Sequence, residues 1–321
     1  MNLSTSYLGL KLNSPFIVGA SPFCDDVHVA RKLQDAGAGA VVMRSLFAEQ
    51  FAAPPVTPAP AGHASGFPAF ADYQWSPDQY LRQLQHLKAN LTIPVIASLN
   101  GHRPGAWLQF ARRLADAGAD AIELNFHRIV ADPGIAGGQV ETEMLQIVAE
   151  VAGAVHRPVA VKLAPFHTSI AQLAMALEQA GASGLVLFNR FYQPDVDTEN
   201  IAVSPSLHLS EPGELLLRLR WLAILSPLLR GSLAAGGGVH NASDVVKALL
   251  TGADAVQVVS VLLRHGPHIL ATLRGGLELW MREHGHSELG QFGGQLNLQR
   301  CREPAAFERA NYIRVLQGCP G

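Results

Sequence analysis

The sequence predicts a single-domain (β/α)8 barrel, the TIM-barrel fold, and three observations favour it. A helix that ends at a glycine, followed within a few residues by a buried strand, recurs along the chain. Eight nearly continuous apolar runs alternate with helical patterns, as parallel strands covered on both faces do. Long polar stretches follow only some of these runs, which is typical of loops at the carboxyl-terminal rim of a barrel.

The recurring unit places Ala-Gly-Ala or a close relative between helix and strand. Its copies are LQDAGAGAVVMRS from Leu33, LADAGADAIELN from Leu114, LEQAGASGLVLFN from Leu177 and LLTGADAVQVVS from Leu249. With the intervening apolar runs, strands are expected to begin near Phe16, Ala40, Val95, Ala121, Val159, Gly184, Ser232 and Ala255. An open, doubly wound sheet is the alternative arrangement of this pattern.

The barrel strands are expected within residues 16–260, and residues 264–321 form a helical carboxyl-terminal extension of the same domain. Two helices are predicted in this extension, Pro267–His284 and Pro304–Gln317, joined by a link rich in glycine and glutamine.

The composition limits the class of protein. The chain has 321 residues, 48% hydrophobic and 16% charged, with a formal net charge of −2. This balance gives no electrostatic reason to bind nucleic acid or an anionic membrane. Cys24, Cys301 and Cys319 have neither disulfide-framework nor metal-site spacing. A soluble cytoplasmic protein is expected, because the sequence lacks a signal-peptide pattern and an apolar run of about 20 residues.

Three long stretches mark the expected mouth of the barrel. They are Leu46–Pro77 after the second strand, Phe126–Val140 after the fourth and Arg190–Gly213 after the sixth. All three are rich in proline, glycine and polar residues and would emerge at one rim. Because loops of this length in a compact domain usually serve a function, we expect the site there.

The segment between the last two strands has the pattern of a phosphate site. A strand runs into three glycines at 236–238, and a helix with Asn241 or Ser243 as its N-cap follows. The last strand, Ala255–Val259, then ends at Ser260 in a polar turn. Glycines allow a ligand to approach the backbone closely, and exposed N–H groups favour an anion. The alternative is that these glycines only form a tight turn.

Polar residues gather where the predicted strands end. These positions are Ala20–Ser21, Arg44–Ser45, Asn100, Asn125, Lys162, Asn189, Gly237–Gly238 and Ser260. Buried asparagine and lysine side chains need partners, so this set favours a flat polar ligand with a phosphate. Lys162 is either a cation facing developing negative charge, a Schiff-base amine, or the partner of a buried carboxylate such as Glu123.

With these motifs the chain resembles the dihydroorotate dehydrogenase family of FMN enzymes over nearly its whole length. The resemblance rests on NSPFIVGAS, MRS, ELN, VKLAP, an asparagine after the sixth strand, AAGGGVHNASD and GADAVQVVS. It is most similar to the branch called dihydroorotate dehydrogenase-like, through SLFAEQ, IASLNG, LFNRFYQPD and AFERANY.

The resemblance implies FMN across the mouth. Lys162 would face the pyrimidine edge of the flavin and stabilise its reduced anion. The other implied cofactor contacts are Ala20, Ser21, Arg44, Ser45, Asn100, Asn125, Asn189, Ser210 near the ribityl chain, and Gly237, Gly238 and Ser260 at the phosphate. Asn125, Arg128 and Asn189 are the substrate-binding candidates.

The sequence departs from the family at the catalytic base. Where the family has Cys or Ser in the loop after the fourth strand, this chain has Arg128, whose guanidinium cannot accept a proton. His127 is the neighbouring candidate base, or else an exposed loop histidine; His102, Cys24 and Tyr192 are weaker candidates. Arg44 stands where the family has lysine, and the family's orotate-gripping loop is not recognisable in GHASGFPAFADY.

We therefore expect an FMN-dependent dehydrogenase acting on CH–CH groups, with dihydroorotate or a related dihydropyrimidine or cyclic enamide as substrate and a place in pyrimidine biosynthesis. The electron acceptor stays open, no metal is expected, and the resemblance suggests a homodimer. The alternatives are a phosphate-binding lyase or aldolase with Lys162 as Schiff base, and a non-catalytic flavoprotein subunit.

Overall fold

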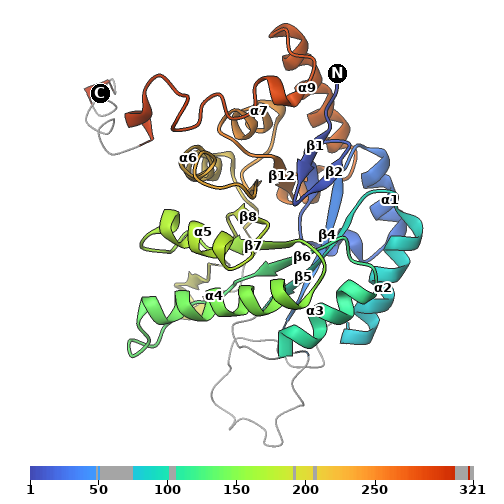
Figure 1. Ribbon diagram of the computed structural model, residues 1–321, viewed down its shortest axis with the longest axis vertical. Coiled ribbons are helices and arrows are strands. Elements are labelled where there is room, and N and C mark those ends of the chain that lie inside the picture. Colours follow the sequence, from blue (N-terminus) through green and yellow to red (C-terminus); the bar gives the residue numbers. More distant parts are fainter. Residues whose placement is uncertain are drawn as a thin grey trace, which may run out of the picture.

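The structure, a computed structural model, describes residues 1–47, 50, 75–100, 106–190, 193–204, 208–307 and 317–318. Its centre is a closed barrel of parallel strands in the order β3-β4-β5-β6-β7-β8-β11-β12, with β12 pairing back to β3. Helices surround the barrel (Figure 1). The predicted fold class is confirmed.

The barrel strands begin where the sequence predicts. They are β3 Phe16–Val18, β4 Ala40–Phe47, β5 Val95–Asn100, β6 Ala121–Asn125, β7 Val159–Leu163, β8 Gly184–Leu187, β11 Ser232–Gly236 and β12 Ala255–Val258. The helices are α1 Val27–Asp35, α2 Pro77–Asn90, α3 Ala106–Asp116, α4 Gly137–Ala154, α5 Ile170–Gln179, α6 Leu215–Leu225, α7 Ala242–Leu250, α8 Ser260–His265 and α9 Ile269–Glu283.

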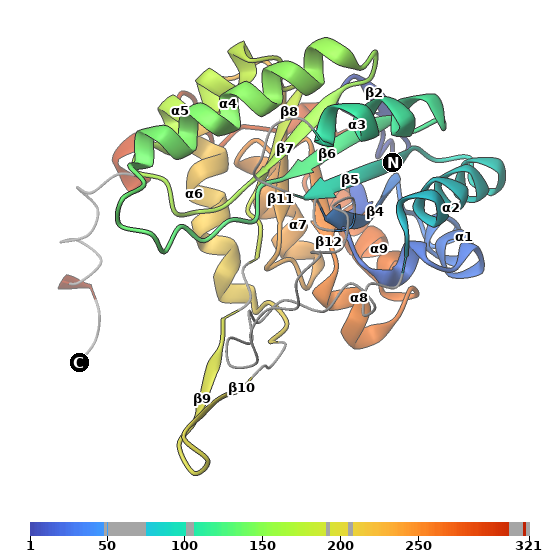
Figure 2. The same cartoon turned by 90° about the horizontal axis from the view of Figure 1, so that it is seen from below.

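Several sequence predictions need correction. Helix α4 begins at Gly137, inside the predicted loop 126–140, because its N-cap Ala136 and two leading glycines give no helix-start signal. The predicted loop 190–213 contains a hairpin, β9 Asp195–Asp197 with β10 Ala202–Ser204, which projects from the barrel (Figure 2). Its three-residue strands are too short to show a period.

The carboxyl-terminal elements also differ in detail. The last strand ends at Val258, and Ser260 begins α8 instead of a polar turn. The predicted helix 267–284 is confirmed as α9, which packs on α7. Of the predicted helix 304–317, the described part is a 3-10 turn, Pro304–Ala306, and residues 308–316 lie outside the described residues.

A hairpin that the sequence analysis missed closes the amino-terminal end of the barrel. It consists of β1 Thr5–Tyr7 and β2 Leu10–Leu12, joined by Leu8 and Gly9, both with positive φ. Positive φ at both central residues is the requirement of a type I′ turn. Tyr7, Leu8 and Leu12 are buried in the barrel interior, against the first residues of the strands. The hairpin therefore fills this end of the barrel.

Candidate functional site

A cavity of about 370 Å³ opens at the carboxyl-terminal end of the barrel. Many of the residues predicted for the site line it: Ala20, Ser21, His127, Lys162, Asn189, Ser210, Gly237, Gly238 and Ser260. Lys162 lies on β7 and the others lie in segments that follow five other barrel strands, and parallel strands deliver their carboxyl ends to one face. We call this space the mouth cavity.

Two buried side chains, Gln257 and Glu123, hold Lys162 in place. Its Nζ donates a hydrogen bond to Gln257 Oε1 at 3.2 Å and lies 3.8 Å from Glu123 Oε1. Gln257 Nε2 in turn donates to Glu123 Oε2 at 2.6 Å. The pairing of Lys162 with Glu123, one of the alternatives raised from the sequence, is therefore confirmed, while Lys162 also lines the mouth cavity.

A chain of hydrogen bonds links the side chains on the other wall of the mouth. Ser45 Oγ lies 2.8 Å from Ser98 Oγ and accepts from Asn125 Nδ2 at 3.0 Å. Asn125 Oδ1 accepts from Asn189 Nδ2. Since each amide is fixed by its neighbour, Asn189 presents a defined face to the cavity. Ser45 and Asn125 lie behind Asn189 and hold it in place.

The hydroxyl groups of Ser210 and Ser260 belong to the lining of the same cavity. Ser260 Oγ accepts from the Ser210 N–H at 3.0 Å, and Ser210 Oγ accepts from the Gly238 N–H at 3.3 Å. A hydroxyl that accepts still has its proton to donate. His240 Nε2 lies 3.4 Å from Ser210 Oγ. This group of donors suits an anion.

Gly237 and Gly238 have φ of +89° and +81°, values that disfavour any side chain. A Cβ on Gly238 would lie 2.5 Å from the backbone nitrogen of Leu215, the first residue of α6. A Cβ on Gly237 would lie 3.2 Å from Nη2 of Arg218. Both glycines therefore serve the turn and the packing of α6, and their phosphate-binding role stays a prediction.

His127 projects into the mouth cavity, while its neighbours Phe126 and Arg128 face away from it. Burial lowers the pKa of His127 below its usual value of 6.5, partly offset by an interaction with its own backbone. The imidazole is therefore predominantly neutral at pH 7 and can accept a proton.

Other predicted residues lie outside the mouth cavity. Arg128 Nη1 pairs with Glu143 Oε2 at 2.6 Å on α4. Arg44 Nε donates to Asp25 Oδ1 at 3.1 Å, and its guanidinium lies 5.8 Å from the centre of the Trp75 ring. Asn100 is buried beside Asn125 in the strand register. The ligand contacts predicted for these three side chains stay predictions.

Cys24 is wrong as a candidate base. The thiol is buried and donates to the Val42 carbonyl, and burial raises its pKa to about 12. It therefore stays protonated at neutral pH and is closed off from substrate. His102, Tyr192 and the GHASGFPAFADY segment lie outside the described residues.

The sequence analysis missed Gln257, Phe188 and Arg190, which also line the cavity. Gln257 had a signal, because a single amide in the apolar run AVQV marks an interior-facing polar position. Arg190 Nε lies 3.3 Å from Glu214 Oε1 at the rim.

Two further findings apply to the residues that the structure describes. No group of three or more His, Cys, Asp or Glu side chains is arranged to hold a metal ion. No helix is long and apolar enough to cross a membrane.

Comparison with known proteins places these observations in context. A family model described as dihydroorotate dehydrogenase matches residues 2–205. The chain is 30% identical over 302 residues to the dihydroorotate dehydrogenase B (NAD(+)) catalytic subunit of Methanosarcina mazei, covering 89% of this chain and 92% of the relative. The subunit of the same name in Pyrococcus abyssi is 27% identical over 303 residues, covering 91% and 98%. The NAD-dependent dihydropyrimidine dehydrogenase subunit PreA of Escherichia coli is 26% identical over 323 residues, covering 92% and 77%.

Proposed function

Because residues 2–205 match its family model, the chain belongs to the dihydroorotate dehydrogenase family, and we propose that it is an FMN-dependent enzyme that transfers hydride between a dihydropyrimidine-type substrate and flavin N5. As a member of this family it is an oxidoreductase acting on CH–CH groups, like its relatives named dihydroorotate and dihydropyrimidine dehydrogenases. Dihydroorotate, or a related dihydropyrimidine or cyclic enamide, is the proposed substrate class.

The observation that carries this proposal is that two chemically different sets of groups line the mouth cavity. One set is the ammonium of Lys162 and the amide of Asn189, which suit the polar edge of a heterocycle. The other set is the hydroxyls of Ser210 and Ser260, which suit a phosphate. A nucleotide-like group with a flat head and an anionic tail, such as FMN, fits these two sets.

His127 is the proposed base. When bound, FMN supplies a hydride acceptor at N5. His127 takes the proton from one substrate carbon as the adjacent carbon loses its hydride, so that a C=C bond forms and charge balances. The lowered pKa of His127 supports this role, because a neutral imidazole is the form that accepts a proton. Asn189 would bind the substrate, held in place by its hydrogen bond to Asn125; a direct contact of Asn125, predicted from the sequence, is not part of this proposal.

The lyase alternative receives no support from Lys162. A Schiff base requires a deprotonated amine, whereas this Nζ lies beside the buried carboxylate of Glu123 and donates to Gln257. These contacts favour a fixed cation instead. Lys162 is therefore proposed as a positive group near the electron-accepting edge of the cofactor.

Anaerobic flavin bleaching tests the substrate class. FMN-loaded protein is mixed with dihydroorotate, dihydrouracil or dihydrothymine, and flavin absorbance is followed. At least one of these compounds is expected to lower the flavin absorbance after mixing. Protein that binds FMN, is bleached by dithionite and responds to none of them would contradict the proposed substrates and favour the alternative of a non-catalytic flavoprotein subunit.

A further inference from the structure

A buried arginine lies against the glycine turn at residues 236–238. Arg218, on α6, is only 5% exposed, and an arginine side chain is seldom buried unless it has a specific partner. A Cβ on Gly237 would lie 3.2 Å from Nη2 of Arg218 and 3.7 Å from its Cζ. Gly237 lines the mouth cavity and Arg218 does not. The guanidinium therefore packs against the wall of the cavity without reaching into it.

Hydrogen bonds of Arg218 fix the position of this turn. Its Nε donates to the Gly236 carbonyl at 2.9 Å, and its Nη1 donates to the Glu214 carbonyl at 2.6 Å. One planar group thus ties the end of β11 to the residue before α6. Beyond Gly236, the Gly238 N–H donates to Ser210 Oγ at 3.3 Å. Arg218 and Ser210 therefore hold the turn at its two ends.

The counter-ion of Arg218 is shared with a second arginine. Glu214 Oε2 lies 3.5 Å from Nη2 of Arg218, and Glu214 Oε1 lies 3.3 Å from Nε of Arg190. Burial lowers the pKa of Arg218 and Glu214 opposes the shift, but a guanidinium stays protonated at neutral pH. A buried cation whose carboxylate is divided between two partners is stabilised by a further anion nearby.

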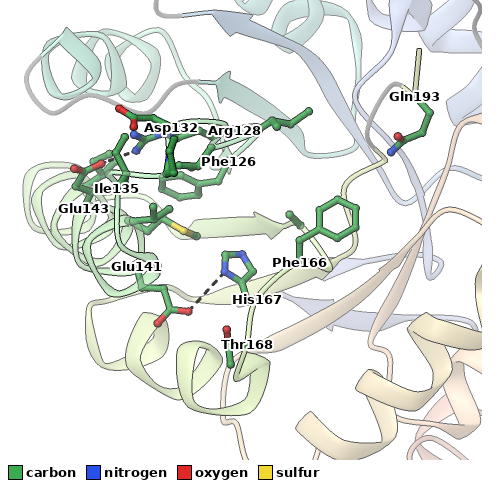
Figure 3. A pocket seen from close by; sticks show the side chains of 18 residues that line it. Phe126, Arg128, Asp132, Ile135, Glu141, Glu143, Phe166, His167, Thr168 and Gln193 are labelled. Atoms are coloured by element: carbon green, nitrogen blue, oxygen red, sulfur yellow. Dashed lines mark hydrogen bonds and ion pairs between the residues drawn. The ribbon is translucent and has the colours of Figure 1, made fainter. Parts of the chain in front are cut away.

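Two cations predicted from the sequence for the site are engaged by other carboxylates. Lys162 is paired with the buried Glu123. Arg128 lines a different cavity, of about 650 Å³, and pairs there with Glu143 (Figure 3). Arg218, which was not predicted, is a cation that lies directly against the glycine turn.

From this arrangement we propose that Arg218 is a positioning residue for the anionic tail of the ligand. It holds the turn in place, and its charge, acting through the turn, makes the cavity favour a phosphate over a neutral group. This inference rests on the proposed function, because FMN supplies the phosphate, and it adds the residue that makes the site prefer the phosphorylated flavin. A purely structural role would change the affinities for flavins with and without a phosphate alike.

Titration of the flavin-free protein with FMN and with riboflavin, followed by flavin fluorescence, tests the proposal. The quantity of interest is the ratio of the two affinities. Arg218→Gln is expected to lower this preference for FMN about fivefold, the scale on which one charge acts on a nearby anion in partly screened surroundings. Riboflavin affinity should stay close to wild type. Arg218→Lys keeps the charge without the planar group and should retain most of the preference.

Arg220→Gln is the matched control, because Arg220 lies on the same helix, is exposed and changes the net charge equally. It should leave the preference unchanged. An equal loss in Arg220→Gln would assign the effect to the net charge of the protein and overturn the inference. So would a loss in Arg218→Lys as large as in Arg218→Gln, since the charge would then not be what matters.

Thermal melting checks that each variant is folded. If Arg218→Gln does not fold, Arg218→Lys decides: a retained preference for FMN supports the proposal and a lost one contradicts it. A wild-type preference for FMN that Arg218→Gln leaves intact would overturn the role of Arg218 while the proposed function stands. Wild-type protein that binds neither flavin, or both equally well, would overturn both.

Discussion

The two ends of the barrel are built from the same strands but have opposite properties. At the amino-terminal end, the β1–β2 hairpin inserts Tyr7, Leu8 and Leu12 among apolar strand residues and closes the barrel. At the carboxyl-terminal end, an open cavity is surrounded by a cation, amides and hydroxyls. The first end is organised for stability and the second for binding.

On three of the strands the change occurs over two residues. On β6 the interior-facing residue Ala121 is followed two positions later by Glu123, and on β7 Ala160 is followed by Lys162. On β12 Ala255 is followed by Gln257. Since residues i and i+2 share a face of a strand, each of these strands carries an apolar layer and then a polar layer. Mutations in the two layers should therefore separate stability from activity.

The largest effect is expected at the mouth, from His127→Ala. If His127 is the base, flavin reduction by substrate should slow by about 10²–10⁴-fold, the usual contribution of a general base. FMN affinity and the melting temperature should stay close to wild type. Stopped-flow absorbance measures the rate, with His156→Ala, an exposed histidine, as control. An unchanged rate removes His127 as the base.

The pH profile sharpens the same assignment. Because burial lowers the pKa of His127, the reduction rate should rise with pH through a value below 6.5 and be constant above it. This acid limb should disappear in His127→Ala. If the reduction rate of His127→Ala still falls at low pH, the titrating group is not His127.

At the closed end, Leu12→Ala is expected to act on stability alone. Leu12 is fully buried, and loss of such a side chain costs about 2–5 kcal/mol of unfolding free energy. Flavin reduction per folded molecule should be unchanged, since the hairpin lies at the other end of the barrel from the mouth. Urea unfolding and rates normalised to bound flavin measure both quantities. A rate loss with full flavin occupancy would show that the two ends are coupled.

A smaller, pH-dependent effect is expected from Asp254→Asn, also near the closed end. Burial raises the pKa of Asp254 from 3.8 to about 6, although its Oδ2 accepts from the Leu233 N–H at 2.8 Å. The folded state thus binds this proton more tightly than the unfolded state does, and ionisation costs stability as pH rises through 6.

Asparagine keeps an acceptor without the charge, so the variant should be more stable than wild type at pH 8 by about 3 kcal/mol. The difference should shrink below pH 6 and vanish near pH 4. Chemical unfolding at several pH values checks this, and a pH-independent difference would assign the effect to packing.

The smallest effect is expected from Ser45→Ala, behind the mouth. The variant removes the hydrogen bonds of Ser45 with Asn125 and Ser98, each of about 1 kcal/mol net. Because Asn125 holds Asn189, the KM for substrate should rise several-fold with little change in kcat. A fall in kcat with constant KM would mean that the network acts in the reaction itself.

Much of the fold could be predicted from sequence because its signals are local. A helix that ends one or two residues before Gly37 or Gly118, followed by a buried run starting at Ala40 or Ala121, fixes the strand positions. The β1–β2 hairpin was missed because three-residue strands show too little alternation, and its Leu8–Gly9 turn lacks the asparagine or aspartate that usually marks such turns.

Site residues could be predicted where strand ends determine them, as for Lys162 and Asn189. Prediction was poorest for long charged side chains, whose partners are far away in sequence. Arg44 is engaged by Asp25 and Arg128 by Glu143, and strand-end spacing carries no information on such choices. The helix start at Gly137 that brings Glu143 into reach was itself not predictable from capping residues.

The most direct test of the central claim is to compare FMN with riboflavin, which lacks the phosphate, in titrations of the flavin-free protein followed by flavin fluorescence. The mouth cavity is expected to bind one FMN per chain and riboflavin at least tenfold more weakly, and the Ser210→Ala/Ser260→Ala double variant should lose most of that preference. Protein that binds neither flavin, or binds both equally well, would contradict the account.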